Sequence, residues 1–395
     1  MPTEISHKTR LFTESVIREM TRRALAAGAV NLAQGFPDFP APIELKEAAK
    51  RAIDQDYNQY AITHGSPNLR RAIADKVRAY NRIECDPDRN VTVTCGATEA
   101  MIASMLAVIN PGDEVIIFEP FYENYGPDVI IAGATPRYVA LDAPDFSIDR
   151  AELEAAFGPH TKAIVINTPH NPTGKVFTRA ELETIAELCR RHDTLAITDE
   201  IYEHIIYGGA QHVSIAALAG MADRTITISG LSKTYSITGW RLAYAVACER
   251  LTSAIRKVHD FLTVGAPHPL QEAGAVAMRL PESFYAELKQ MYERKRAALY
   301  GALTGAGLRC HRPDGAYYIM AEIGELGFAD DLEAADFFLD QVGVAPVPGS
   351  SFYHRSELGR AMLRFTFSKS DETIAAAADR LKLLGAKLAA RPRRT

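Results

Sequence analysis

The chain has 395 residues, of which 47% are hydrophobic and 24% are charged. This composition is typical of a globular protein with room for two domains, and it excludes a disordered or fibrous chain. The formal net charge of −5, with no long basic run, argues against nucleic-acid or membrane-surface binding as the main role.

The N-terminal residues 1–10 are polar and mixed in charge, and no apolar stretch is long enough to cross a membrane. We therefore expect a cytoplasmic protein. The five cysteines are scattered, without a CxxC pair or a zinc-type spacing. We expect them to be reduced, and we expect no metal site.

The N-terminal part of the chain shows helical spacing over residues 11–29, 43–54 and 68–81. Between the first two helices, Gly35 is followed closely by three prolines, which predicts a stiff, extended strip. Such a strip either lines a pocket or simply connects two domains.

From residue 90 the pattern alternates between short apolar runs and helical segments with short joints, which predicts a largely parallel α/β sheet. Thr178 and Glu181 form a capping box that starts one of the helices. The expected strands are 90–94, 114–119, 163–168, 195–198, 224–228 and 242–247, and the expected helices are 100–109, 178–190 and 249–261.

The C-terminal part predicts a second, smaller α+β domain. Its expected helices are 284–303, 332–342 and 371–388, and its strands are 316–321 and 363–367. We therefore expect residues 1–42 to form an N-terminal arm and part of the small domain, residues 43–283 the large domain, and residues 284–395 the small C-terminal domain.

Several polar or aromatic residues follow the predicted strands, where open α/β sheets bind ligands. The turn 95–99 opens a helix and suits either a phosphate or a simple helix entry. Tyr122 could cover a flat ring or pack in the core, and Asn171 could bind a ligand or serve a turn. Asp199, at the end of a buried strand, needs a cation or donors, and Tyr202 is close in sequence.

Lys233 lies on a turn between two buried strands, within the segment 229–241. A desolvated lysine becomes nucleophilic and can condense with a carbonyl. The alternative is a lysine whose stem packs while its head reaches water. Arg241, eight residues further on, could hold an anion near it.

Three segments together resemble the class I/II aminotransferases of fold type I, which use pyridoxal phosphate. They are Gly230 to Ala243 (GLSKTYSITGWRLA), Asn171 to Gly174 (NPTG) and Asp199 to Tyr202 (DEIY). Residues 31–39, 58–60 and 119–122 are most similar to the branch of kynurenine, glutamine and methionine aminotransferases. The resemblance covers nearly the whole chain.

The resemblance implies a role for each matching residue. Lys233 would hold the cofactor as an aldimine and move the substrate proton, Asp199 would pair with the pyridine nitrogen, and Tyr202 would bind the ring oxygen. The remaining implied ligands are Tyr122 and Asn171 for the ring, Ala97, Thr98, Ser232, Arg241 and the Tyr60 of a second subunit for the phosphate, and Arg364, Asn171 and the Gly35 backbone for the substrate α-carboxylate. It also implies a homodimer with shared active sites.

Two positions depart from the family pattern. Gly230 stands where many members have a phosphate-binding serine, so Ser229 or Ser232 must compensate. Val264 and Gly265 stand where kynurenine enzymes have Phe-His, which leaves the side-chain preference open.

The substrate is the least determined feature. Phe12 aligns with an aromatic residue at the pocket mouth of related enzymes, and no second arginine can be assigned to a side-chain carboxylate. We therefore expect methionine, glutamine or aromatic amino acids to be better donors than aspartate. β-Elimination or another reaction on the same cofactor is the alternative, with aspartate or succinyl-diaminopimelate as alternative substrates. A DNA-binding regulator on this fold is disfavoured because no extra module is apparent.

Overall fold

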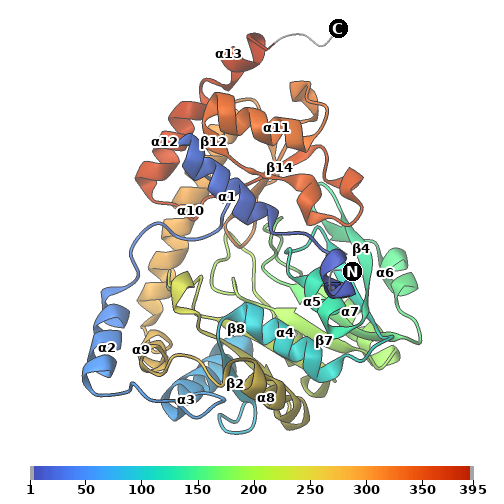
Figure 1. The fold of residues 1–395 in the computed structure, drawn as a ribbon, viewed down its shortest axis with the longest axis vertical. Coiled ribbons are helices and arrows are strands. Elements are labelled where there is room, and N and C mark those ends of the chain that lie inside the picture. The colour runs from blue at the N-terminus through green and yellow to red at the C-terminus, as the bar shows by residue number, and fades with distance from the viewer. Residues whose placement is uncertain (1–3, 392–395) are drawn as a thin grey trace.

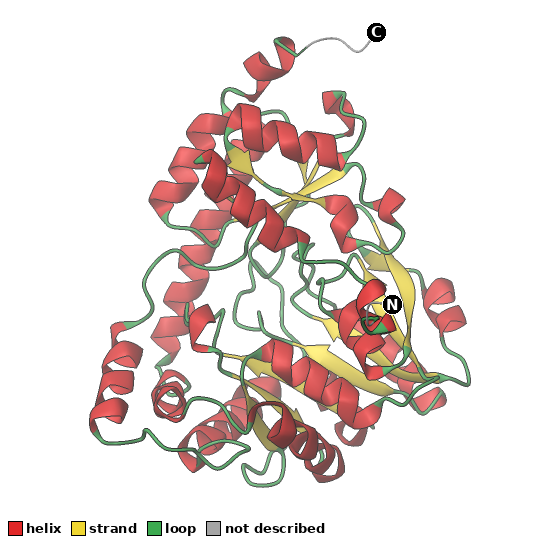
Figure 2. Ribbon diagram, viewed as in Figure 1, coloured by secondary structure: helices red, strands yellow, loops and turns green. Residues whose placement is uncertain are grey.

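The computed structural model describes residues 4–391 (Figure 1). Figure 2 shows a large sheet flanked by helices in the lower part of the molecule and a smaller group of strands and helices above it. The large sheet has eight strands in the order β2-β9-β8-β7-β6-β3-β4-β5. The pairs β2-β9, β9-β8 and β4-β5 are antiparallel, and the other four pairs are parallel. The expected α/β fold with a mostly parallel sheet is confirmed.

The strands of this sheet are short and largely buried, as expected for a sheet covered on both faces. Their bounds are β2 Val91–Thr94, β3 Glu114–Glu119, β4 Thr135–Asp142, β5 Ser147–Ile148, β6 Thr161–Asn167, β7 Leu195–Asp199, β8 Thr225–Gly230 and β9 Ala243–Ala247. The flanking helices are α2 Ile43–Asp54, α3 Pro67–Lys76, α4 Ala97–Val108, α5 Tyr125–Ala132, α6 Arg150–Ala156, α7 Arg179–Arg191, α8 Glu249–Thr263 and α9 His268–Ala277.

Alternate residues of β3 face two separate cores. Val115 and Ile117 pack with α4, α5 and α8, whereas Ile116 and Phe118 pack with α6 and α7. Because both faces are buried, the side chains that reach a ligand must come from the strand ends and the loops after them.

The upper part contains an antiparallel sheet in the order β10-β11-β14-β13 and a parallel pair, β1 with β12. The strands are β1 Val30–Asn31, β10 Arg309–Cys310, β11 Tyr318–Glu322, β12 Val344–Ala345, β13 Val347–Pro348 and β14 Met362–Thr366. The helices are α1 Val16–Ala27, α10 Glu282–Gly305, α11 Asp331–Phe337, α12 Asp371–Leu381 and α13 Leu384–Ala389.

The first helix and strand pack with this C-terminal part, as Figure 1 shows for α1 beside β12. The domain boundaries at residues 42 and 283 stay a prediction.

Some element boundaries differ from the predicted ones. The helix expected over 11–29 begins only at Val16, because the Ser15 side chain caps it by accepting the backbone N–H of Arg18. The helix expected over 100–109 begins earlier, at Ala97, and the last helix is divided into α12 and α13. The capping box of Thr178 and Glu181 is present.

Candidate active site

A cavity of about 910 Å³ opens at the carboxyl ends of β3, β6, β7 and β8. Eleven of the residues predicted from the sequence line it together, although they come from segments far apart in the chain. They are Gly35, Ala97, Thr98, Tyr122, Asn171, Asp199, Tyr202, Ser232, Lys233, Arg241 and Arg364.

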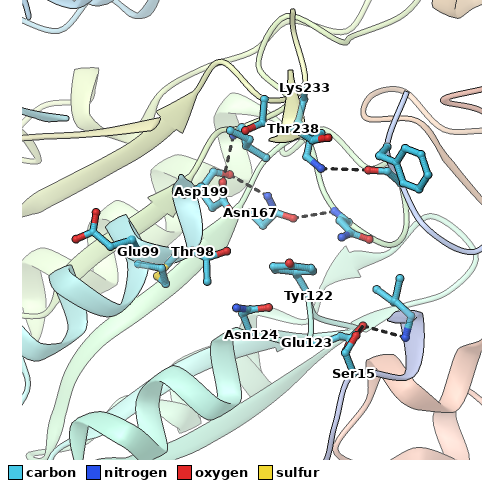
Figure 3. A pocket seen from close by; sticks show the side chains of 18 of the residues that line it. Ser15, Thr98, Glu99, Tyr122, Glu123, Asn124, Asn167, Asp199, Lys233 and Thr238 are labelled. Atoms are coloured by element: carbon cyan, nitrogen blue, oxygen red, sulfur yellow. Dashed lines mark hydrogen bonds between the residues drawn. The ribbon is translucent and has the colours of Figure 1, made fainter. Parts of the chain in front are cut away.

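Asp199 ends β7 at the base of the cavity (Figure 3) and is buried. Its Oδ2 accepts a hydrogen bond of 2.8 Å from the Tyr125 hydroxyl, and its Oδ1 accepts one of 3.2 Å from the Ile201 backbone. Burial raises the pKa of this carboxyl to about 6, although the Tyr125 bond acts in the opposite direction. A protonated ring nitrogen placed here would stabilise the carboxylate.

Lys233 follows β8 and is half-buried because it faces the cavity. Its Nζ donates to the Gly35 carbonyl at 3.1 Å, and the rings of Tyr202 and Tyr317 lie 5.8 and 5.9 Å away. Burial lowers the pKa of the amine to about 8, with Asp199 opposing that shift. Lys233 therefore does not extend to the outer surface, and part of it is a neutral nucleophile near pH 8.

Arg241 lies against the first turn of α4. A Cβ atom on Gly96 would come within 2.2 Å of its Nη2, so only glycine permits this approach. Arg241 itself has a left-handed backbone (φ 56°, ψ 53°), and its Nη1 donates to the Thr238 carbonyl at 3.0 Å. The guanidinium and the free N–H groups of Ala97 and Thr98 form a site suited to a phosphate.

Arg364, on β14, is completely buried. Its Nη1 donates to Asn171 Oδ1 at 2.8 Å, its Nη2 donates to the Ala33 carbonyl at 2.5 Å, and its guanidinium lies 4.3 Å from the Tyr318 ring centre. Within residues 4–391 its Nε has no hydrogen-bond partner. A rigid, buried guanidinium with an unused donor suits a substrate carboxylate.

Three predicted site residues do not line the cavity. Ser229 is buried, and its hydroxyl donates to Glu203 at 2.6 Å, so it is not available to a phosphate there. Phe12 is half-buried outside the cavity lining, and Tyr60 is 85% exposed on the surface.

The glycine at position 230 has a packing reason. A Cβ atom there would come within 2.7 Å of the Ala243 Cβ on the neighbouring strand β9. A serine at this position would force β8 and β9 apart, which leaves Ser232 as the serine that lines the cavity.

A network of buried polar groups lies behind Asp199. Glu200 accepts a hydrogen bond from the Ser214 hydroxyl at 2.8 Å, and its second oxygen lies 2.9 Å from His212 Nε2. Glu203 forms an ion pair with Lys76 and accepts a hydrogen bond from Asn81 at 2.7 Å. Oxygen and nitrogen atoms of Glu200, Glu203 and His212 lie within 4.8 Å of one another. Because these carboxylates already accept several donors, we interpret the cluster as support for the end of β7.

Sequence reasoning missed two residues that join the strand ends. Asn167, the last residue of β6, donates to the Asp199 carbonyl at 2.9 Å and accepts from the Asn171 backbone at 2.7 Å. In the sequence, the feature that could have identified Asn167 is a polar residue at the end of a buried strand. Tyr318 pairs with Tyr202 through their hydroxyls at 2.9 Å, but in the sequence it has the appearance of an ordinary core residue.

The N-terminus of α1 also reaches the cavity. Glu123 Oε1 accepts from the Ser15 hydroxyl at 3.0 Å and from the Ile17 backbone at 3.3 Å (Figure 3). Ser15, Ile17, Arg18 and Glu123 all line the cavity, and we call these four residues the cavity mouth. Arg18 is thus a third arginine in the cavity lining, besides Arg241 and Arg364.

Comparison with known proteins agrees with this geometry. The family model described as aminotransferase class I and II matches residues 27–381. The chain belongs to the class I and II aminotransferase family. A probable N-succinyldiaminopimelate aminotransferase of Mycobacterium tuberculosis is 38% identical over 387 residues, covering 95% of this chain and 98% of that protein. The methionine aminotransferase of Escherichia coli is 35% identical, covering 94% and 96%.

The structure of N-succinyldiaminopimelate aminotransferase from Mycobacterium tuberculosis superimposes with a TM-score of 0.94 at 38% identity, covering 97% of this chain and all of that one. Kynurenine aminotransferases are also among the relatives. This aminotransferase therefore has the predicted fold type and catalyses transamination. Within residues 4–391 no helix has the length and apolar character needed to cross a membrane.

Proposed function

We propose that this aminotransferase uses pyridoxal phosphate to move an amino group from an L-amino acid to a 2-oxo acid, with Lys233 as the catalytic amine. The observation that carries the proposal is the convergence of Lys233, Asp199 and Arg364 in one cavity. An amine, a buried carboxylate and a buried guanidinium are the groups that the cofactor and an amino-acid carboxylate require.

The residues of the cavity fit this cofactor. Lys233 would bind its carbonyl carbon, Asp199 its pyridine nitrogen, and Tyr202 and Asn171 its ring oxygen. Tyr122 would cover the ring, and Ala97, Thr98, Ser232 and Arg241 would hold its phosphate. When bound, pyridoxal phosphate supplies an electron sink that stabilises negative charge at the substrate Cα.

The side chains of the protein perform the remaining tasks. Arg364 binds the α-carboxylate, and its bond to Asn171 fixes its orientation. Lys233 Nζ takes up and returns the proton of the substrate Cα, for which its lowered pKa of about 8 is suited. The carboxylate of Asp199, held by the Tyr125 hydroxyl, would keep the pyridine nitrogen of the cofactor protonated.

We propose methionine, glutamine and aromatic amino acids as donors that are better than aspartate. Support comes from the apolar side chains of Ile17, Phe36, Ile102 and Leu262 in the cavity lining. An apolar wall favours a thioether or a ring, whereas a short acidic side chain loses hydration against it. The names of the methionine and kynurenine relatives agree with this choice.

We also propose a homodimer in which Tyr60 completes the phosphate site of the second subunit. Support comes from the exposure of the side chains of Tyr60 (85%), Ile62 (50%) and Phe261 (92%), which a partner subunit would cover. Light scattering of the active enzyme should give twice the chain mass. A fully active monomer would contradict this arrangement. The cytoplasmic location stays a prediction.

The test of the function uses enzyme loaded with pyridoxal phosphate. Mixing with methionine should convert the visible absorbance of the lysine-bound cofactor to that of its amine form, and a 2-oxo acid should reverse the change. Release of a thiol, ammonia and pyruvate from a cysteine S-conjugate, without conversion of the cofactor to its amine form, would instead show a β-lyase, the alternative reaction on the same groups.

A further inference from the structure

We propose that His259 is a positioning residue for the cofactor phosphate. As an imidazolium that donates from both ring nitrogens, it joins the turn 95–99 at the start of α4 to the segment 58–65, which carries Tyr60. The proposal rests on the proposed function, because it concerns how the chain holds the cofactor. His259 stands on α8 and does not line the cavity, so it acts only through the groups that it binds.

The first argument is the pair of hydrogen bonds at the His259 ring, which is completely buried. Nδ1 lies 2.9 Å from Glu99 Oε1, and Nε2 lies 2.8 Å from the Thr63 carbonyl oxygen. A carboxylate and a backbone carbonyl only accept hydrogen bonds, so both ring nitrogens must donate. A neutral imidazole carries one N–H group, and this geometry therefore requires the imidazolium.

The groups bound to the ring favour the protonated form. Burial lowers the pKa of the His259 imidazole. The hydrogen bond and the charge of Glu99, the Thr63 carbonyl and the charge of Asp260 outweigh burial, so the pKa lies above its ordinary value. The hydrogen-bond geometry and the surrounding charges thus agree.

The other titratable groups around the ring do not compete with Glu99. The charge of His259 reaches His64, but burial lowers the pKa of His64 to about 4, so this side chain is neutral at about pH 7. Burial raises the pKa of the Cys95 thiol, which is therefore neutral there as well. On α8 itself, Arg256 donates to the Val91 carbonyl at 2.6 Å.

Glu99 connects the imidazolium to the turn 95–99. Its Oε2 accepts the backbone N–H of Cys95 at 2.9 Å, while its Oε1 faces His259. Figure 3 shows Glu99 next to Thr98, with its carboxylate pointing away from Lys233. Glu99 therefore holds the turn without occupying the N–H groups in the first turn of α4 that suit a phosphate.

Thr63 connects the imidazolium to the segment of Tyr60. The segment 58–65 contains no helix or strand, so its position depends on a few backbone hydrogen bonds. On one side of Tyr60 the Thr63 carbonyl accepts from the imidazolium, and on the other side the Gln59 carbonyl accepts from His268 Nδ1 at 3.1 Å. These two bonds fix the place from which the exposed Tyr60 side chain projects.

Loss of one proton from His259 should release one of the two connections. A neutral imidazole donates a single hydrogen bond, and its other nitrogen then faces an acceptor. Because the pKa of the folded protein is raised, both connections are present below that pKa and one is lost as pH rises through it. Binding of the cofactor should weaken over the same pH range.

The experiment measures the dissociation constant of pyridoxal phosphate by fluorescence titration of the apoprotein from about pH 6 to about pH 10. At the acidic end, His259→Asn should weaken binding about tenfold, because a hydrogen bond to a charged group is lost. The ratio of variant to parent constants should then fall as pH rises. Taking this ratio cancels the titration of the cofactor itself, which both proteins share.

Two further variants separate positioning from general packing. Glu99→Gln presents an amide N–H to a neutral Nδ1 and an oxygen to the Cys95 backbone, so it should retain more binding than His259→Asn and should lack the alkaline weakening. His160→Asn removes an exposed histidine before β6 and should leave the pH profile of the parent unchanged.

Proton NMR of the apoprotein, with histidine labelled by ¹⁵N, tests the imidazolium without cofactor. The parent should show two exchange-protected ring N–H signals for His259, and Glu99→Gln should lose the Nδ1 signal alone. A single ring N–H signal in the parent, or a variant-to-parent ratio that stays constant with pH, would overturn the proposal. A parent protein that binds no pyridoxal phosphate at any pH would overturn the proposed function instead.

Discussion

The base of the cavity and its mouth are built differently. At the base, Asp199 and Lys233 follow buried parallel strands and are held by Tyr125, Ile201 and Gly35. At the mouth, Arg18 lies in the first turn of α1, which Ser15 caps, and the start of this helix meets the rest of the site through Glu123. Within residues 4–391, the polar groups at the base have hydrogen-bond partners, whereas the guanidinium of Arg18 at the mouth makes no ion pair or hydrogen bond.

This difference suggests how the two parts divide the work. Groups on strand ends keep fixed distances, which the chemistry at one carbon atom requires. Residues of a peripheral helix can be substituted without disturbing the sheet, so such substitutions can change the preferred substrate. Relatives with different substrates in their names fit this division.

The largest effect should follow from removing the amine at the base. Lys233→Ala should lower transamination by about 1,000-fold or more, because general acid–base and covalent catalysis are lost together. Steady-state turnover and the visible spectrum measure the loss. Lys257→Ala, an exposed lysine on α8, serves as the control and should behave as the parent. Substantial turnover by Lys233→Ala would contradict the assignment of Lys233 as the catalytic amine.

The second largest effect should come from the buried carboxylate. Asp199→Asn should lower activity about 100-fold, because a neutral amide cannot stabilise a protonated ring nitrogen with preorganised charge. Cofactor should still bind. Tyr125→Phe, which removes one donor to Asp199 Oδ2, should have a smaller effect of about tenfold. Turnover of Asp199→Asn within a few-fold of the parent would show that another group maintains the charge.

The same contrast separates what the sequence could predict from what it could not. Residues 229–241 and 199–202 sit on predicted strand ends, and local pattern placed Lys233, Asp199 and Arg241 in one cavity. Arg18 could not be found in this way, because an arginine in a helix has the appearance of a solvated surface charge. Its place depends on where α1 packs, and that is fixed by the pairing of β1 with β12 over 300 residues away.

Local pattern also failed where tertiary packing decides. Ser229 was expected near the phosphate, but the alternation of β8 turns its side chain toward Glu203, on the other side from the cavity. Position 230 must be a glycine because Ala243 on β9 packs closely against it, and a short sequence motif does not reveal this contact. The strands that carry the site were therefore predictable, although β4 (Thr135–Asp142) was not among the expected strands. The direction of single side chains at strand ends was not predictable.

The contrast between the two buried aspartates near the base predicts a pH effect on stability. Asp128, one turn after Tyr125 on α5, is buried, and its Oδ2 has no partner within residues 4–391. Burial raises the pKa of this carboxyl to about 7, whereas its value in the unfolded chain is about 3.9. Between these values the folded state retains a proton that the unfolded state has lost, so unfolding free energy falls as pH rises toward 7.

Asp128→Asn should remove that dependence. Its free energy of unfolding should exceed that of the parent by about 2 kcal/mol more at pH 8.5 than at pH 5.5, since one pKa unit corresponds to about 1.4 kcal/mol. Urea titrations at both pH values and one protein concentration measure the difference. A constant difference between the two proteins would mean that the carboxyl of Asp128 does not change its pKa on folding.

The most direct test of the division between the base and the mouth of the cavity is a measurement of single-turnover rates with the parent, Arg364→Lys and Arg18→Gln. The four donors to compare are glutamate, glutamine, 2-aminoadipate and norleucine. Arg364 is proposed to bind the α-carboxylate that every donor shares, so its variant should slow all four donors by a similar factor. Arg18 lies at the mouth, so Arg18→Gln should change the rates of the four donors by unequal factors. A selective loss with Arg364→Lys, or a uniform loss with Arg18→Gln, would contradict the account.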